Sequence, residues 1–167
     1  MPGKMKGKLK GSHPPRSLKY AIWGFISGTL SILAILAVTK MAGHPLLIGS
    51  FGASAVLLFG ANDSALAQPR NLIGGHLLSA ITAVLIVALF GSGPYAMAVG
   101  VGAAIFLMYM THTIHPPGGA TALIGIQGHA GFGFVLVPVL AGVLILLVVA
   151  LFTNNVVHHR QYPKHWL

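Results

Sequence analysis

Histidine and hydroxyl side chains are the groups in this sequence that could bind a small ligand or carry a proton. His115 stands before two prolines and two glycines, His76 follows two glycines inside an apolar run, and Ser54 lies in a second glycine-containing stretch. Imidazole is the one side chain whose ordinary pKa lies near neutral pH, and in its charged form it donates from both ring nitrogens. These residue types therefore predict a site for a small ion or a proton.

The segment 114–123 interrupts a long apolar run with Pro116-Pro117 and Gly118-Gly119. Proline has no N–H and pushes the preceding residue out of the helical region, so a helix arriving through 108–113 is predicted to end near His115. A second helix is predicted to follow, with the free N–H groups of residues 119–121 at the positive end of its dipole. Such an end attracts anions.

An earlier stretch repeats this arrangement. His44-Pro45, then Gly52-Ala53-Ser54-Ala55, matches His115-Pro116, then Gly119-Ala120-Thr121-Ala122. Each copy lies between apolar runs of membrane length, which indicates two repeats of span, short broken helix and span. Interrupted hydrophobic segments at matching positions of two halves point to the binding site of a transporter.

The composition is typical of a polytopic membrane protein. Of the 167 residues, 55% are hydrophobic and 7% are charged, and the mean hydropathy is +0.83. The surface of a soluble domain needs far more charge. The chain has no cysteine, which excludes disulfides, thiolate metal sites and cysteine nucleophiles. Asp63 is its only acidic residue, so a relay of carboxylates through the bundle is not expected.

The expected fold is an all-α polytopic membrane protein with four full transmembrane helices and two short broken or re-entrant helices. The four spans are predicted at 20–41, 72–90, 95–113 and 134–153, with a kink at Pro138. The short helices are predicted to begin near Gly52 and Gly119, and Gly74-Gly75 should permit close helix packing. A bundle this thin, with glycine-rich faces, also predicts a homo-oligomer.

The expected organisation is a basic cytoplasmic arm over 1–19, one transmembrane domain over 20–153 with repeats at 20–90 and 95–153, and a polar cytoplasmic tail over 154–167. Six of the ten Lys and Arg lie in the arm. Basic segments stay inside, so both termini are predicted to face the cytoplasm of the cell (inner) membrane, after an even number of crossings. If the short segments instead traverse as extended and helical chain, there are six crossings and the repeats are inverted. The arm could also bind anionic lipid headgroups.

Arg70 shares the one long polar interval inside the bundle, 62–71, with Asp63. This interval is either a solvent loop with a surface ion pair or the mouth of an anion path with Arg70 as its selectivity charge. The equivalent hydroxyls of Ser54 and Thr121 could reach a substrate or bond back to a carbonyl. The candidate substrate-binding residues are His115, Pro116, Pro117, Gly118, Gly119, Ala120, Thr121, Gly52, Ala53, Ser54, Arg70 and His76.

The stretch from His115 to Leu123 resembles the HPP family of integral membrane proteins, as do the stretches 50–59 and 68–76. The resemblance covers about residues 18 to 155. Family members are small proteins with about four spans, in bacteria and plastids, and some have been assigned nitrite transport. The resemblance therefore implies a nitrite or small-anion transporter in a membrane. Gly118 stands where the family commonly has alanine.

Three classes of function compete. The favoured one is a passive or proton-linked transporter of a small anion, with no enzyme activity, cofactor, bound metal or nucleic-acid partner. The second is a divalent-metal transporter that uses imidazoles, which suit zinc or nickel but lack a carboxylate or thiol to balance charge. Its ligands would be His44, His76, His112, His115 and His129. The third is an intramembrane hydrolase with Ser54 as nucleophile and His76 or His115 as base.

Overall fold

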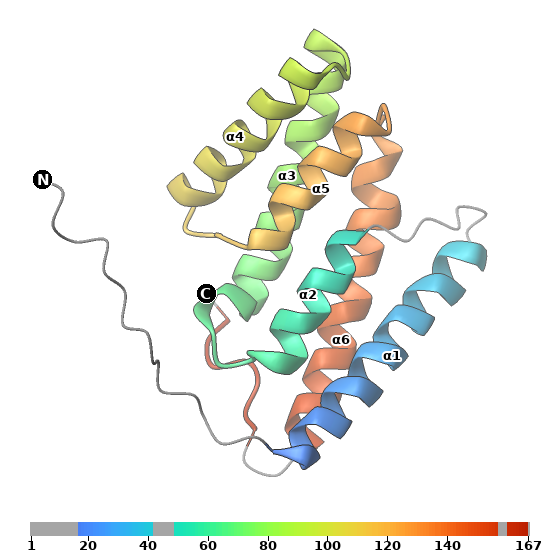
Figure 1. The fold of residues 1–167 in the computed structure, drawn as a ribbon, viewed down its shortest axis with the longest axis vertical. Helices are drawn as coiled ribbons and strands as arrows, with labels where there is room; N and C mark the ends of the chain where they lie inside the picture. The colour runs from blue at the N-terminus through green and yellow to red at the C-terminus, as the bar shows by residue number, and fades with distance from the viewer. Residues whose placement is uncertain (1–16, 42–48, 157–159, 167) are drawn as a thin grey trace, which may run out of the picture.

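The structure is a computed structural model that describes residues 17–41, 49–156 and 160–166. Over these residues it is helical throughout and has no strand. His44-Pro45 of the first repeat and residues 1–16 of the basic arm lie outside them. The helices are α1 (Leu18–Met41), α2 (Gly49–Gly60), η1 (Ala65–Ala67), α3 (Pro69–Phe90), α4 (Pro94–Met110), α5 (Pro116–Gln127), η2 (Val135–Leu140) and α6 (Ala141–Val156), with the six α-helices labelled in Figure 1.

Proline sets the first residue of three helices. Pro69, Pro94 and Pro116 each occupy the first turn of α3, α4 and α5. A proline fits there because its fixed φ suits the helix and its missing N–H would have had no partner anyway. The helices therefore begin earlier than the apolar pattern predicted. The difference is three residues both in α3, which was expected from residue 72, and in α5, which was expected from Gly119.

The expectation of four full spans is not confirmed. Three units of the described chain are long and apolar enough to cross a membrane, namely Leu18–Met41, Pro69–Phe90 and Val135–Val156. The helix α4 has 17 residues, and α2 and α5 have 12 each. At 1.5 Å per residue, α4 is about 26 Å long. The two short helices are confirmed, as is the break at Pro138, where Val137 has a non-helical backbone.

The two halves of the chain have matching packing partners. In the first half α1 packs against α2 and α6, while in the second α4 packs against α5 and α3. Likewise α2 contacts α6 as α5 contacts α3. Figure 1 shows α1 rising, α2 descending and α3 rising, followed by the opposite directions in α4, α5 and α6. The second half is thus an inverted copy of the first, with α2 and α5 at the centre.

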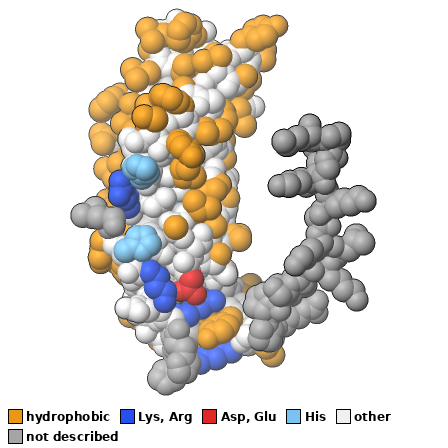
Figure 2. Space-filling view, turned by 90° about the vertical axis from the view of Figure 1, so that its left-hand side faces the viewer, with side chains coloured by type: hydrophobic (Ala, Val, Ile, Leu, Met, Phe, Trp, Pro, Cys, Tyr) orange, Lys and Arg blue, Asp and Glu red, His pale blue; other side chains and the backbone are white. Residues whose placement is uncertain are grey.

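The surface divides into apolar and polar regions. Many large hydrophobic side chains of α1, α4 and α6 are exposed, as suits helices in contact with lipid. Figure 2 shows hydrophobic side chains covering the upper part of one face, while charged side chains and histidines gather over its lower half. The main buried core joins α2, α3 and α6 through residues such as Phe51, Leu58, Leu72, Val143 and Leu146.

Candidate functional site

Five polar side chains meet where α2 and α5 lie beside α3. We call Ser50, Ser54, His76, His115 and Thr121 the central polar cluster. None of the five has any exposed surface. The two serines come from the first two turns of α2, His76 from α3, and His115 and Thr121 from the start of α5. The N-terminal ends of the two short helices therefore lie side by side.

His76 is held between two hydroxyls at equivalent positions of the two repeats. Its Nε2 lies 2.8 Å from the Ser54 Oγ, and its Nδ1 lies 2.7 Å from the Thr121 Oγ1. The Thr121 hydroxyl is also hydrogen-bonded to the Ser50 hydroxyl at 2.8 Å. The Phe51 ring covers the imidazole, with ring centroids 5.7 Å apart. Both ring nitrogens of a fully buried histidine are thus satisfied by side chains of the two short helices.

His115 joins the same cluster from the other side of Ser54. Its Nε2 lies 2.8 Å from the Ser54 Oγ, and its Nδ1 lies 2.8 Å from the carbonyl oxygen of Leu66. The two imidazoles are neighbours, with ring centroids 4.9 Å apart. Ser54 is therefore the single hydroxyl shared by both histidines.

Glycines of α3 let the turn before α5 approach so closely. A Cβ at Gly75 would meet the Cβ of His115 and would lie 3.0 Å from the carbonyl oxygen of Thr113. A Cβ at Gly74 would lie 2.6 Å from the Thr113 side chain. A Cβ at Gly118 would lie 2.8 Å from the carbonyl oxygen of Gly75. The predicted close packing at Gly74-Gly75 is confirmed.

The start of α5 offers fewer free N–H groups than the sequence predicted. Because the helix begins at Pro116, the N–H groups of Ala120 and Thr121 lie within the helix's own hydrogen-bond ladder. Pro116 and Pro117 have no N–H, and the Gly118 N–H donates to the His115 carbonyl at 2.8 Å. An anion at this helix end would meet the dipole and the side chains of the central polar cluster rather than the predicted row of free backbone donors.

Other candidate residues lie outside the cluster. Gly52 and Ala53 are exposed on α2, and a Cβ at Gly52 or at Gly119 would meet no atom within 4 Å. Pro116 is exposed, while Pro117 is buried. Ala120 is half-buried. The structure thus brings together Ser54, His76, His115 and Thr121 of the twelve candidates, and adds Ser50, which the sequence analysis did not select.

The remaining described histidines are dispersed. His112 is exposed in the turn after α4, and His129 contacts Ser92 at the other end of α5. His112 and His115 share no helix face, since α4 ends at Met110. Within the described ranges, no three histidine, aspartate or glutamate residues are grouped to hold a metal ion.

An open groove lies beside Leu66. We call it the outer groove; its volume is about 340 Å³, and it is lined by Leu66, Asn71, Tyr109, His112 and Ile114. The Asn71 amide fixes the groove wall by donating to the Ile114 carbonyl at 2.8 Å. Beside it, the exposed Arg70 donates to the carbonyl of Thr111, the C-cap of α4, at 3.0 Å. The surface ion pair of Asp63 is instead with Lys164, at 3.2 Å.

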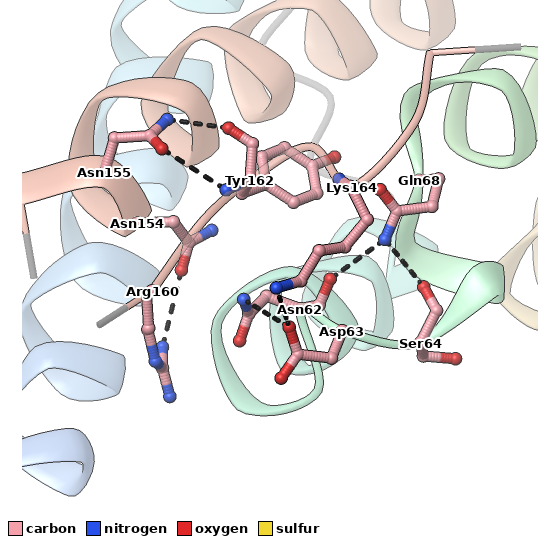
Figure 3. Close-up of polar contacts among 9 residues, drawn as sticks. All are labelled: Asn62, Asp63, Ser64, Gln68, Asn154, Asn155, Arg160, Tyr162 and Lys164. Atoms are coloured by element: carbon pink, nitrogen blue, oxygen red, sulfur yellow. Dashed lines mark hydrogen bonds and ion pairs between the residues drawn. The ribbon is translucent and has the colours of Figure 1, made fainter.

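The chain end holds the loop that carries Leu66. Residues 160–164, which we call the C-terminal clasp, lie against the 61–68 loop (Figure 3). The Tyr162 hydroxyl donates to the Ala67 carbonyl at 2.8 Å, and the backbone N–H of Lys164 donates to the Gln68 Oε1 at 2.8 Å. The Gln68 amide in turn donates to the carbonyls of Asn62 and Ser64. Burial raises the pKa of the Tyr162 phenol, which keeps it a donor.

Arg160 of the clasp and Asn154 of α6 both bind carbonyls at the end of α2. Arg160 donates to the Phe59 carbonyl at 2.7 Å, and Asn154 donates to the Leu58 carbonyl at 3.0 Å. These are among the last carbonyls of the helix, which lack partners within it. The Arg160 guanidinium also lies over the Tyr20 ring, 4.6 Å from its centroid. The tail therefore joins α1, α2 and the 61–68 loop.

Tyr162→Phe is expected to destabilise the folded chain by about 1–2 kcal/mol, because the buried Ala67 carbonyl loses its donor while the ring still packs. Thermal unfolding in detergent would measure the change. Tyr20→Phe is the matched control, because the Tyr20 ring is half exposed and its contact with Arg160 uses the ring face. Equal midpoints for the two variants would contradict the role of the Tyr162 hydroxyl.

The sequence analysis missed Ser50, the Leu66 carbonyl and the clasp. Ser50 lies outside the repeated Gly-Ala-Ser/Thr motif, so only its position four residues before Ser54 on one helix face could have pointed to it. The clasp has no motif; its polar residues resemble an ordinary solvated tail. Tyr162 was the available signal, since an aromatic side chain in a polar tail buries a large apolar area when it packs.

Comparisons with known proteins identify a family and two relatives of this chain. Residues 13–163 match the transmembrane region that defines the HPP proteins. One transmembrane protein of Dictyostelium discoideum is 43% identical over 98% of this chain and 62% of its own length. A second is 44% identical over 86% of this chain and 50% of its own length. No solved structure matches.

The chain thus spans about half to three-fifths of the relatives that it matches, whose names state only that they are transmembrane proteins. The matched region includes every described helix and the whole central polar cluster. The chain belongs to the HPP family of transmembrane proteins.

Proposed function

We propose that this protein transports a small inorganic anion, with nitrite as the first candidate, through the central polar cluster. The observation that carries the proposal is a fully buried group of two imidazoles and three hydroxyls at the meeting point of two inverted repeats. Hydroxyls and imidazolium groups donate hydrogen bonds to an anion. The polar groups of a membrane interior are costly and commonly mark a substrate path.

The charge of the chain supports an anion rather than a cation. The formal net charge is +9, and the one acidic side chain, Asp63, lies on the surface beside Lys164. No carboxylate is therefore available to balance a metal ion at the two clustered histidines. Arg70 and His112 at the outer groove would attract an anion toward Leu66, the residue between the groove and His115.

The inverted halves support a transport cycle. All five side chains of the cluster are sealed from both ends of the bundle in this conformation, so a substrate could enter only if one half moves against the other. We infer that the chain crosses the membrane six times, because α1 and α3 run in the same direction, as do α4 and α6, so α2 and α5 must each return the chain across the bundle (Figure 1). The homo-oligomer expected from the sequence belongs to the same proposal.

Flux into vesicles tests the function. The purified full chain in liposomes is expected to move nitrite down its gradient faster than protein-free vesicles do, with nitrate, formate and chloride as competitors. Arg70→Gln should raise the half-saturating nitrite concentration by about threefold to tenfold, since one charge at a wet site contributes about 1 kcal/mol. Lys40→Gln, in the last turn of α1, is the matched control. Zinc flux without nitrite flux would refute the proposal and support the metal alternative.

A hydrolase is the second candidate, because the contact of Ser54 with two imidazoles resembles that of a nucleophile and its base. Against this role, the Ser54 hydroxyl is already hydrogen-bonded to both histidines, and its side chain has no exposed surface. Labelling by a serine-directed fluorophosphonate probe, lost in Ser54→Ala, would support the hydrolase; an unlabelled protein that moves nitrite would support the transporter.

A further inference from the structure

We propose that the central polar cluster is a directional proton relay. It takes up a proton at Ser50, holds it on His115 and releases it on the side of the Leu66 carbonyl. The Ser54 hydroxyl is the obligatory link between the two histidines. The relay deepens the proposed function, because it supplies the route for a proton that accompanies the anion. It rests on that function only for the identity of the anion.

The Leu66 carbonyl sets the direction of the relay in its neutral state. A carbonyl oxygen can only accept, so the His115 Nδ1, 2.8 Å away, must carry a proton. With the ring neutral, the His115 Nε2 is bare and accepts from the Ser54 hydroxyl. The Ser54 oxygen then accepts from the His76 Nε2. The two adjacent histidines are therefore opposite tautomers.

The hydrogen bonds of the neutral state continue from His76 through Thr121 to Ser50. With its proton on Nε2, neutral His76 has a bare Nδ1, which accepts from the Thr121 hydroxyl at 2.7 Å. In the structure the Thr121 hydroxyl donates to the Ser50 Oγ at 2.8 Å, which is the direction of this bond after a proton has entered. In the neutral state the Ser50 hydroxyl must rotate to donate to the Thr121 oxygen. Every buried polar atom has a partner, in agreement with the absence of unsatisfied buried side-chain atoms in the described residues.

One added proton reverses every bond between Ser50 and His115. A weak acid or hydronium gives its proton to the Ser50 oxygen, and the original Ser50 proton passes to Thr121. The Thr121 proton then passes to the His76 Nδ1, the His76 Nε2 proton to Ser54, and the Ser54 proton to the His115 Nε2. The acid leaves as its conjugate base, His115 becomes imidazolium, and no electron is transferred.

Release on the other side follows from the position of His115. Its Nδ1 proton points at Leu66, whose residue lines the outer groove with His112. Loss of that proton to a base in the groove leaves a bare Nδ1 facing a carbonyl oxygen. Two lone pairs then oppose each other, which disfavours this state. To return to the first direction, each imidazole must lose its proton from one ring nitrogen and gain a proton at the other, and water supplies this exchange when one half moves against the other.

The described surroundings contribute no competing charge. The described side chains beside the cluster are apolar or carry a hydroxyl: the Phe51 ring lies against His76, and Ser79 and Met108 lie against Gly118 in the first turn of α5. Among described residues, the titratable groups in contact with either imidazole are the other imidazole and the hydroxyls of the relay. The two histidines therefore titrate as one coupled unit.

Nitrogen NMR on the full chain with ¹⁵N-labelled histidine in lipid vesicles tests the relay without any transport assay. Protonated and bare ring nitrogens give well-separated shifts, and comparison with His76→Gln and His115→Gln assigns them. At pH 8 we expect an Nδ1-protonated His115 and an Nε2-protonated His76. On acidification, His115 should gain its second proton and His76 should change to the Nδ1 tautomer at a common midpoint.

Ser54 variants test the link itself. Ser54→Ala is expected to separate the two midpoints by about one pH unit or more. It should also lower nitrite-driven proton entry, measured with a trapped pH dye, by at least about tenfold. Ser54→Thr keeps a hydroxyl and should restore both. Ser31→Ala is the control, because this buried hydroxyl of α1 bonds to the carbonyl of Gly28 in its own helix.

The outcomes separate the relay from the anion proposal. Identical tautomers on the two wild-type histidines would overturn the relay even if Ser54→Ala does not fold. Unchanged midpoints and proton entry in a folded Ser54→Ala would do the same while leaving nitrite transport in place. A coupled titration in a protein that moves no nitrite would support the relay and refute the anion proposal.

Discussion

Gly75→Ala is expected to lower the midpoint of thermal unfolding by roughly 5–10 °C. The added Cβ would meet the Cβ of His115 and lie 3.0 Å from a backbone oxygen, so α3 and the turn before α5 must separate. Overpacking of this kind costs about 1–3 kcal/mol, and each kcal/mol shifts the midpoint by about 2–4 °C in a chain of this size. Heating the detergent-solubilised protein, then measuring the folded fraction by size-exclusion chromatography, gives the midpoint.

Gly52→Ala is the matched control for that measurement. Gly52 also lies in a helix, but it is exposed and an added Cβ meets no atom within 4 Å. Alanine in a helix is favoured over glycine by about 0.5–1 kcal/mol, so the midpoint should stay or rise slightly. If both variants lose the same stability, the close approach of His115 to α3 is wrong.

Nitrite uptake is expected to increase as the external pH falls from 8 to 6, by up to about tenfold per pH unit while the receiving histidine is mostly neutral. An imidazolium holds an anion that a neutral imidazole does not, so the proton and the anion bind cooperatively. His115→Gln removes the group that holds the proton and should remove this dependence. Initial rates in liposomes, corrected for the leak of undissociated acid into protein-free vesicles, measure it.

His129→Gln is the control for the pH profile. His129 contacts Ser92 at the other end of α5, outside the central polar cluster and the outer groove, so its variant should keep the wild-type slope. The elution profile of each variant establishes that it folds. A slope that is the same in wild type and His115→Gln would indicate a plain anion channel, or protonation of the anion before it enters.

The sequence alone determined the class of protein and the places where its helices break. Hydrophobic content places the chain in a membrane, and this needs no knowledge of contacts. Proline acts on its own residue and the one before it, so the break near His115 and the kink at Pro138 follow from local geometry. The repeat of Gly-Ala-Ser/Thr likewise predicted that Ser54 and Thr121 are counterparts. The expected four full spans were not confirmed, because α4 is shorter than the apolar run that contains it.

Only the tertiary structure decided which polar groups meet. The bonds of Ser54 join residues 22 and 61 positions apart, and the bond between Thr121 and Ser50 joins residues 71 positions apart. Such pairs depend on how α2, α3 and α5 cross, which in turn depends on the missing side chains of Gly75 and Gly118. The direction of the relay depends on the backbone carbonyl of Leu66. Every residue has such a carbonyl, so the sequence does not mark this one. Local preferences act through neighbouring residues, whereas these contacts exist only once three helices have packed.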